Sequence, residues 1–174
     1  MMDPHAPIFL IGYRGTGKST VARLLAAELK WDTVDADVEI ERLAKKTIAA
    51  IFAEQGEPAF RDLEAGVVAE LAGRQRVVIA LGGGAVLRTD NRAAIRGAGP
   101  VVWLKAAVDT IESRIAADAT TAQRRPNLTA TGGRAEIETL LAEREPKYRE
   151  CATLVVATDG KTCAEVANEI LDQL

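Results

Sequence analysis

This sequence of 174 residues has few aromatic residues and no excess of basic charge. Phe, Trp and Tyr together make up 4% of it, and the formal net charge is −3 at pH 7. A surface that binds nucleic acid normally carries a basic face or aromatic side chains on which bases stack. The composition therefore predicts no nucleic-acid partner.

The sequence also has little of what a metal centre or a disulfide framework needs. It contains one histidine, His5, and two cysteines, Cys151 and Cys163, without the spacing of metal ligands. We interpret the cysteines as buried or half-buried free thiols in a reducing compartment. No apolar run approaches membrane-spanning length, and residues 1–7 are too short and polar for a targeting peptide. These absences predict a cytoplasmic protein with no membrane partner.

What is present is a regular alternation of apolar, strand-like runs and helical patterns. Strands are predicted at 8–11, 33–34, 77–81, 101–104 and 154–157, of which 33–34 is the weakest candidate. Helices are predicted between them at 18–29, 36–45, 59–73, 89–96, 107–117, 134–150 and 161–173. This alternation predicts a three-layer α/β/α fold with a five-stranded parallel sheet, formed by 1–174 as a single domain.

One segment differs in character from the rest of the chain. Residues 118–134 are polar, lack helical periodicity, and contain Arg124-Arg125-Pro126 and Gly132-Gly133. A stretch of this length in a compact domain is usually functional or mobile, although a solvated surface loop has a similar composition. We expect a mobile lid at 118–134 between core regions at 7–117 and 135–174.

The most specific motif is Gly12-Tyr13-Arg14-Gly15-Thr16-Gly17-Lys18-Ser19, which fits the phosphate-binding P-loop pattern G-x-x-x-x-G-K-[ST]. It follows a predicted strand and opens a predicted helix, as that loop requires. Its glycines let the backbone aim N–H groups at phosphate oxygens, and the helix N-terminus adds partial positive charge. Lys18 is expected to reach the β- and γ-phosphates and Ser19 to bind Mg²⁺. The motif predicts binding of a nucleoside triphosphate.

Signatures of other P-loop classes are missing. The sequence has no Asn-Lys-x-Asp motif for guanine, no strand followed by Asp-x-x-Gly, and no strand ending in the Mg²⁺-directed Asp of motor-type ATPases. The run at 77–81 ends instead in Gly82-Gly83-Gly84. This places bare backbone at the carboxyl edge of a parallel sheet, where ligands bind, although a tight turn would also use glycine.

Asp35 and Asp37 follow the short second strand, at the same predicted edge of the sheet. One carboxylate could hold a magnesium-bound water while the other accepts the proton of a substrate hydroxyl. The alternative is that this pair only caps the N-terminus of the next helix. The pair is compatible with phosphoryl transfer to a small hydroxylated acceptor.

Two arginines indicate that this acceptor is acidic. Arg144 shares a helix face with apolar Ile137, Leu141 and Tyr148, so its guanidinium suits a ligand carboxylate or phosphate. Extension of the side chain to solvent is the alternative. Arg61, three residues before Glu64, is also compatible with a surface ion pair.

Taken together and in this order, the motifs resemble those of the shikimate kinases from residue 8 to about residue 158. They are GYRGTGKS, Asp35-Ala36-Asp37, Gly56-Glu57 leading into Phe60-Arg61-Asp62-Leu63-Glu64, Val78 to Gly84, Arg125-Pro126, and Arg144 before Tyr148-Arg149. The resemblance implies a P-loop transferase that phosphorylates the 3-hydroxyl of shikimate with ATP, in aromatic amino-acid biosynthesis. Two alternatives stay open: a P-loop kinase for another small metabolite such as gluconate, and a non-catalytic nucleotide-binding regulatory domain.

The resemblance also implies roles for individual residues. The implied catalytic residues are Lys18, Asp37 and Arg125, and the implied magnesium ligands are Ser19 and Asp35. ATP would be bound by Gly12, Gly15, Thr16, Gly17, Lys18, Ser19, Thr20, Arg124 and Arg125. Either Arg124 or Arg125 would be the main arginine of the lid. Shikimate would be bound by Asp37, Arg61, Gly82, Gly83, Gly84 and Arg144, with Arg61 and Arg144 on its carboxylate. Asn127 departs from the family, in which leucine is more usual. The expected protein is a monomer that uses ATP, Mg²⁺ and shikimate.

Overall fold

In a computed structural model that describes residues 3–118 and 132–174, five parallel strands form one sheet in the order β2-β3-β1-β4-β5. The strands are β1 (Ile8–Ile11), β2 (Asp32–Asp35), β3 (Val77–Ala80), β4 (Val101–Lys105) and β5 (Leu154–Ala157). The predicted strands are confirmed, each within one residue at either end. The predicted fold class is confirmed with them.

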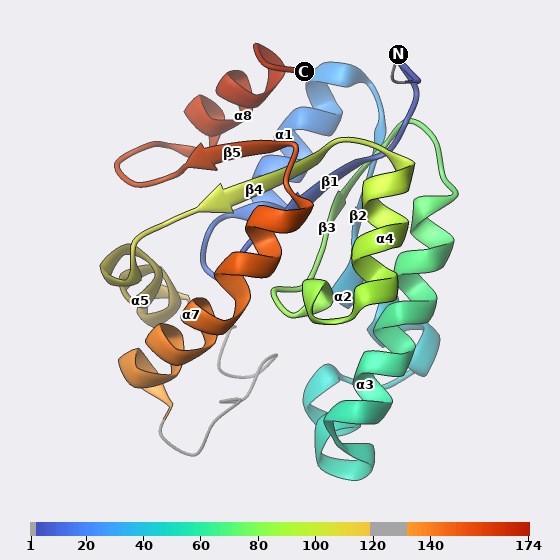
Figure 1. Ribbon diagram of the computed structural model, residues 1–174, viewed down its shortest axis with the longest axis vertical. Helices are drawn as coiled ribbons and strands as arrows, with labels where there is room; N and C mark the ends of the chain where they lie inside the picture. The colour runs from blue at the N-terminus through green and yellow to red at the C-terminus, as the bar shows by residue number, and fades with distance from the viewer. Residues whose placement is uncertain (1–2, 119–131) are drawn as a thin grey trace.

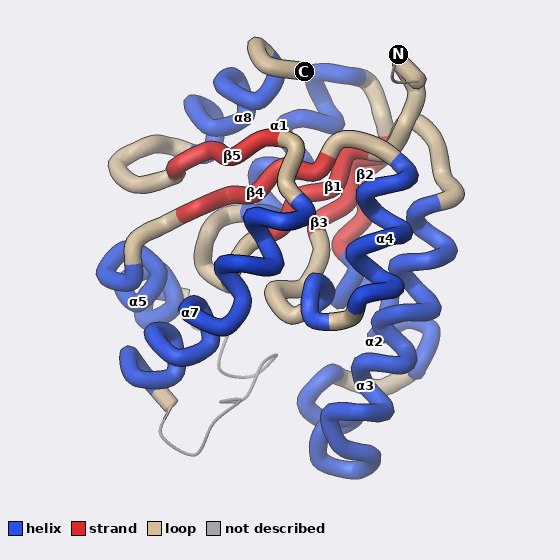
Figure 2. Tube along the Cα trace, viewed as in Figure 1, coloured by secondary structure: helices blue, strands red, loops and turns tan. Residues whose placement is uncertain are grey.

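Helices cover both faces of this sheet, as Figures 1 and 2 show. Helices α1 and α8 pack on one face, and α3, α4 and α7 on the other. In chain order the helices are α1 (Lys18–Leu29), α2 (Ala36–Ala44), α3 (Ile48–Ala72), the short 3-10 helix η1 (Ala85–Leu87), α4 (Thr89–Ala98), α5 (Val108–Ala117), α7 (Gly133–Cys151) and α8 (Cys163–Leu171).

The central strand β1 shows why the core has two halves. Phe9 and Ile11 are buried against the layer of α3, α4 and α7, whereas Ile8 and Leu10 are buried against α1 and α8. Side chains alternate across a strand, so a strand covered on both faces must be apolar throughout. This is why Ile8–Ile11 carries no polar residue. No helix in the described part of the chain is both long and apolar enough to cross a membrane.

The part of helix α3 that precedes a kink at Gly56 was not predicted from the sequence. The helix begins at Ile48 rather than at 59, after Thr47, whose hydroxyl accepts the N–H of Ala50 at 3.1 Å. Gly56 interrupts the helical geometry with φ 83° and ψ 172°, and Pro58 follows. Both residues normally end helices, but here the chain resumes its helical path after a kink.

Smaller differences occur at other helices, including α4, which ends at Ala98 rather than at 96. Helix α7 begins at Gly133, so the last two residues of the predicted lid are helical. Helix α8 spans Cys163–Leu171 rather than 161–173, and Leu174 is 50% exposed. The capping box of Thr162 and Glu165 fixes where α8 begins.

Strand register brings the predicted motifs to one edge of the sheet. Ala80 near the end of β3 pairs with Leu10 of β1 and with Asp35 of β2. The residues that follow these three strands therefore meet at the carboxyl edge, where open α/β sheets bind ligands.

Candidate active site

The loop between β1 and α1 owes its shape to glycine. Gly12, Gly15 and Gly17 have φ values of 141°, 82° and 89°, a region that other residues rarely adopt. A Cβ added at Gly12 would also lie only 2.5 Å from the carbonyl oxygen of Leu104. These glycines lead directly into the N-terminus of α1, an arrangement that binds phosphate.

Lys18 stabilises this loop through hydrogen bonds to the loop backbone. Its Nζ donates hydrogen bonds to the carbonyl oxygens of Gly12 at 2.7 Å and Tyr13 at 2.9 Å. The hydroxyl of Thr16, 2% exposed, also donates to Tyr13 O, at 2.8 Å. Gly12 and Thr16 therefore shape the loop, whereas Lys18 also lines the cavity beside it.

This first cavity collects most of the residues predicted to meet ATP and Mg²⁺. Its walls include Gly15, Gly17, Lys18, Ser19, Thr20, Asp35 and Asp37. Asp37, which was predicted to be both catalytic and shikimate-binding, also lines this cavity, from the first turn of α2. Arg124 and Arg125, with most of the predicted lid, lie outside the described residues.

Asp35 serves two partners through its two oxygens. Oδ1 accepts the N–H groups of Asp37 at 2.9 Å and Val38 at 3.4 Å, so it caps α2. Oδ2 accepts the hydroxyl of Ser19 at 2.6 Å. The capping alternative is thus correct for one oxygen, while the other joins a hydroxyl at the cavity. Hydroxyl and carboxylate oxygens are ligands that Mg²⁺ prefers, so this pair fits the ion.

A second cavity adjoins the first and has a different lining. It is bounded by Tyr13, Arg14, Ile48, Phe52, Phe60, Arg61, Glu64, Gly82, Gly83, Gly84 and Arg144. Phe52 and Phe60 pack with ring centroids 4.9 Å apart and supply an apolar wall. Arg14 borders both cavities, so the two meet at the P-loop.

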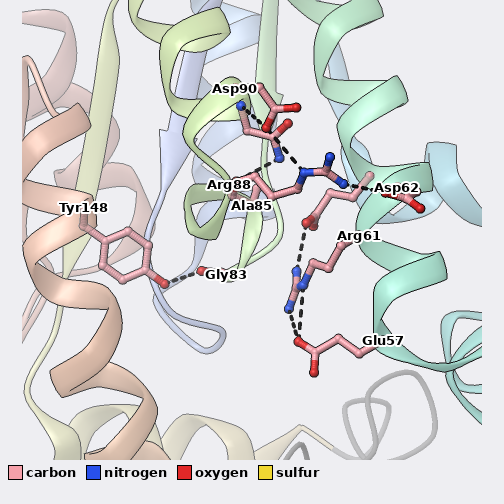
Figure 3. Close-up of polar contacts among 10 residues, drawn as sticks. Glu57, Arg61, Asp62, Gly83, Ala85, Arg88, Asp90 and Tyr148 are labelled. Atoms are coloured by element: carbon pink, nitrogen blue, oxygen red, sulfur yellow. Dashed lines mark hydrogen bonds and ion pairs between the residues drawn. The ribbon is translucent and has the colours of Figure 1, made fainter.

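Arg61 reaches the second cavity from α3 in a network of ion pairs. Its Nη1 lies 2.8 Å from Glu64 Oε1, and its Nη2 lies 3.3 Å from Glu57 Oε1; Figure 3 shows Arg61 with Glu57. The side chain of Glu64 is 1% exposed, so the alternative of a surface ion pair is wrong. Burial raises the pKa of Glu64, although the neighbouring Arg61 and Arg144 oppose that shift.

Arg144 reaches the same cavity from α7 and is 4% exposed, so it does not extend to solvent. Within the described residues it forms no hydrogen bond or ion pair, and its Nε is buried without a partner. Its Cζ lies 5.6 Å from the ring centroid of Tyr13. A buried charge is costly unless it is paired, and a ligand carboxylate or phosphate would supply that partner.

Gly83 and Gly84 are needed for the space they leave rather than for an unusual conformation. Neither residue has a positive φ. A Cβ at Gly83 would lie 3.2 Å from Nη1 of Arg144, and one at Gly84 would lie 2.6 Å from Cζ of Arg61. Successive glycines therefore let two guanidinium groups approach the backbone. The segment also forms a turn, which the N–H of Ala85 closes on the carbonyl oxygen of Gly82 at 3.1 Å, but that turn does not require glycine because neither central residue has a positive φ.

Several contacts at the site were not predicted from the sequence. Arg14 Nη2 lies 2.9 Å from Glu136 Oε2, an ion pair whose carboxylate is fully buried at the start of α7. The hydroxyl of Tyr148 donates to the carbonyl oxygen of Gly83 at 2.5 Å (Figure 3). Arg114 donates to Gly15 O at 3.3 Å and to the side chain and carbonyl of Thr158. The only sequence signal was the place of Tyr148 on the buried stripe of α7.

A phosphate-binding loop at the end of a central parallel strand, beside a cavity with two guanidinium groups, defines a P-loop kinase. The family model for shikimate kinase matches residues 14–174. The shikimate kinase of Rhodopirellula baltica is 46% identical over 94% of this chain and 88% of its own, and that of Nitratidesulfovibrio vulgaris is 45% identical over 88% and 87%. The chain belongs to the shikimate kinase family, which confirms the resemblance of its motifs.

Solved structures agree with this assignment. A shikimate kinase from Acinetobacter baumannii in complex with shikimate has a TM-score of 0.91 and 35% identity, covering 98% of this chain and 93% of its own. A gluconokinase from Sinorhizobium meliloti, with a TM-score of 0.60 and 20% identity over 96% of this chain and 90% of its own, shares the fold alone.

Proposed function

We propose that this protein transfers the γ-phosphoryl group of ATP to the 3-hydroxyl of shikimate, giving shikimate 3-phosphate and ADP. The observation that carries the proposal is Arg144, a buried guanidinium that forms no hydrogen bond or ion pair among the described residues and lines a cavity that adjoins the P-loop. Arg61 lines the same cavity, and two guanidinium groups suit the carboxylate of a small acceptor. Family membership and the likeness to a shikimate kinase in complex with shikimate support that choice of acceptor.

Phosphoryl transfer depends mainly on positioning and on compensation of charge, and the described residues are suited to both. The P-loop and Lys18 would hold the phosphates, and Asp37 would accept the proton of the acceptor hydroxyl. Ser19 and Asp35 would hold Mg²⁺, which supplies charge neutralisation at the phosphates when it is bound. Arg61 and Arg144 would orient the acceptor from the second cavity. We assign the implied role of a lid arginine to Arg124 or Arg125.

We also propose that the enzyme works as a cytoplasmic monomer. Cys151 is buried and Cys163 half-buried, and both are free thiols, in keeping with a reducing compartment.

The test is an ADP-release assay with shikimate, gluconate and AMP in parallel. Shikimate alone is expected to support turnover. The methyl ester of shikimate is the matched control, because it keeps the three hydroxyls and lacks the charge that Arg61 and Arg144 would bind. A markedly higher KM is expected for the ester. Turnover with gluconate or AMP, or equal use of acid and ester, would contradict the proposal.

A further inference from the structure

The peptide unit between Gly83 and Gly84 separates the two guanidinium groups of the second cavity. Gly83 lies against Arg144 of α7, and Gly84 lies against Arg61 of α3, at the close approaches given above. Helices α3 and α7 both pack on η1, which begins at the next residue. The position of this peptide therefore influences the distance between the two guanidinium groups.

Backbone hydrogen bonds to Gly82 O and Gly84 O close the turn around this peptide, and a side-chain hydroxyl binds the carbonyl oxygen of the peptide itself. Tyr148 donates to the carbonyl oxygen of Gly83 at 2.5 Å (Figure 3), from a side chain that is 0% exposed. Its ring packs on Trp103 of β4 with centroids 5.7 Å apart. This contact with the sheet restrains the ring and therefore the position of its hydroxyl. The peptide is trans, and fixing its carbonyl therefore also fixes the opposite direction of the Gly84 N–H.

The same helix face carries both contacts to Gly83. Tyr148 lies four residues after Arg144 on α7, a spacing that places the two side chains one turn apart on one face. Glycine has more backbone freedom than any other residue. Without the hydroxyl, the segment Gly82–Gly84 has no side chain of its own to restrain the Gly83 carbonyl.

We propose that Tyr148 is a positioning residue for acceptor binding. Its hydroxyl fixes the Gly83–Gly84 peptide and thereby the spacing of Arg61 and Arg144 around the acceptor carboxylate. This inference rests on the proposed function, because it requires the acceptor to bind in the second cavity. Tyr148 itself need not touch the acceptor.

Tyr148→Phe tests the proposal, since it removes the hydroxyl and keeps the ring on Trp103. The dissociation constant and the KM for shikimate should rise about 3- to 10-fold, the effect of one lost hydrogen bond. Neither kcat nor the dissociation constant for ATP should change by more than about twofold, which is the scatter expected of a neutral substitution. The loss should be smaller for the methyl ester than for shikimate, because the effect acts through the guanidinium groups.

Thr153→Val is the matched control. It also removes a hydroxyl bonded to the backbone, since Thr153 donates to Val101 O at 3.1 Å and accepts Val101 N–H at 3.0 Å, away from both cavities. It should lower Tm without changing either dissociation constant. If the wild-type protein does not phosphorylate shikimate, the proposed function is wrong. If it does, and Tyr148→Phe lowers Tm without raising the shikimate dissociation constant above that of Thr153→Val, the positioning role is wrong.

Discussion

Arg144 shows at the scale of one residue how a ligand site can oppose stability. Its guanidinium is 4% exposed and has no hydrogen bond or ion pair among the described residues. A buried charge without a partner opposes folding, and an apolar side chain of similar size removes that cost. Arg144→Met should therefore raise the free energy of unfolding by about 1 kcal/mol or more, while shikimate binding is lost. Urea unfolding and calorimetric titration of the same protein measure both effects.

Arg144→Lys and Arg61→Lys separate charge from geometry. Lysine keeps the charge but lacks the planar, two-pronged donor set of arginine, so each change should weaken shikimate binding by roughly 1.5–3 kcal/mol. The dissociation constant for ATP should stay nearly unchanged. An equal loss of ATP affinity would assign these arginines to the nucleotide site or to the core instead.

At the scale of elements, the segment after β3 needs glycine at two positions, because a side chain there would crowd an arginine of the second cavity. Gly84→Ala would place a Cβ 2.6 Å from Cζ of Arg61, whose head is held by Glu64 and Glu57. We expect the Arg61 guanidinium to be displaced and shikimate affinity to fall at least about 10-fold, the effect of one disturbed charged hydrogen bond. The fold should remain, because the clash is with the end of a side chain.

Gly66→Ala is the control for this change. Gly66 is exposed on α3, the helix that carries Arg61, and an added Cβ there meets nothing within 4 Å. Alanine in a helix interior should stabilise the protein by about 0.5–1 kcal/mol and leave shikimate affinity unchanged. If Gly84→Ala behaved like Gly66→Ala in calorimetry, the steric role of the glycine segment would be disproved.

The elements differ in how well the sequence predicts them, for a physical reason. Strands such as Ile8–Ile11 are short, apolar and buried on both faces, so their extent is visible in the residues themselves. The part of α3 before Gly56 was missed because Gly56 and Pro58 normally end a helix, and only tertiary packing shows that the chain continues through the kink.

The same distinction applies to the site. The P-loop is local, so its glycines and Lys18 could be predicted from eight consecutive residues. The pair of Arg14 and Glu136 joins residues 122 positions apart. The bond from Tyr148 to Gly83 spans 65 positions. No local pattern encodes such partners, because they depend on where α7 packs relative to the sheet.

At the scale of the whole molecule, the parallel sheet places two cavities side by side at its carboxyl edge. Arg14 borders both, and its ion pair with the fully buried Glu136 ties the P-loop to the first turn of α7. Helix α7 also carries Arg144 and Tyr148. The P-loop and the second cavity are therefore built on a shared framework rather than on separate parts.

Glu64 makes the stability of this whole framework depend on pH. Burial raises its pKa above the ordinary value of 4.5, so the folded protein holds this proton more tightly than the unfolded chain does. Between 4.5 and the raised value, unfolding releases the proton, and the contribution of Glu64 to stability falls as the pH rises. Glu64→Gln cannot ionise. Its free energy of unfolding should therefore increase relative to the wild type as the pH rises above 4.5, until the folded-state pKa is passed.

Urea unfolding of both proteins at a series of pH values from 4.5 upward measures this difference. Other carboxylates with lowered pKa values, such as Glu39 and Asp159, titrate in both proteins and cancel in the comparison. A difference that stays constant with pH would mean that Glu64 titrates in the folded protein as it does in the unfolded chain. The ion pair with Arg61 would then offset the whole cost of burying this carboxylate.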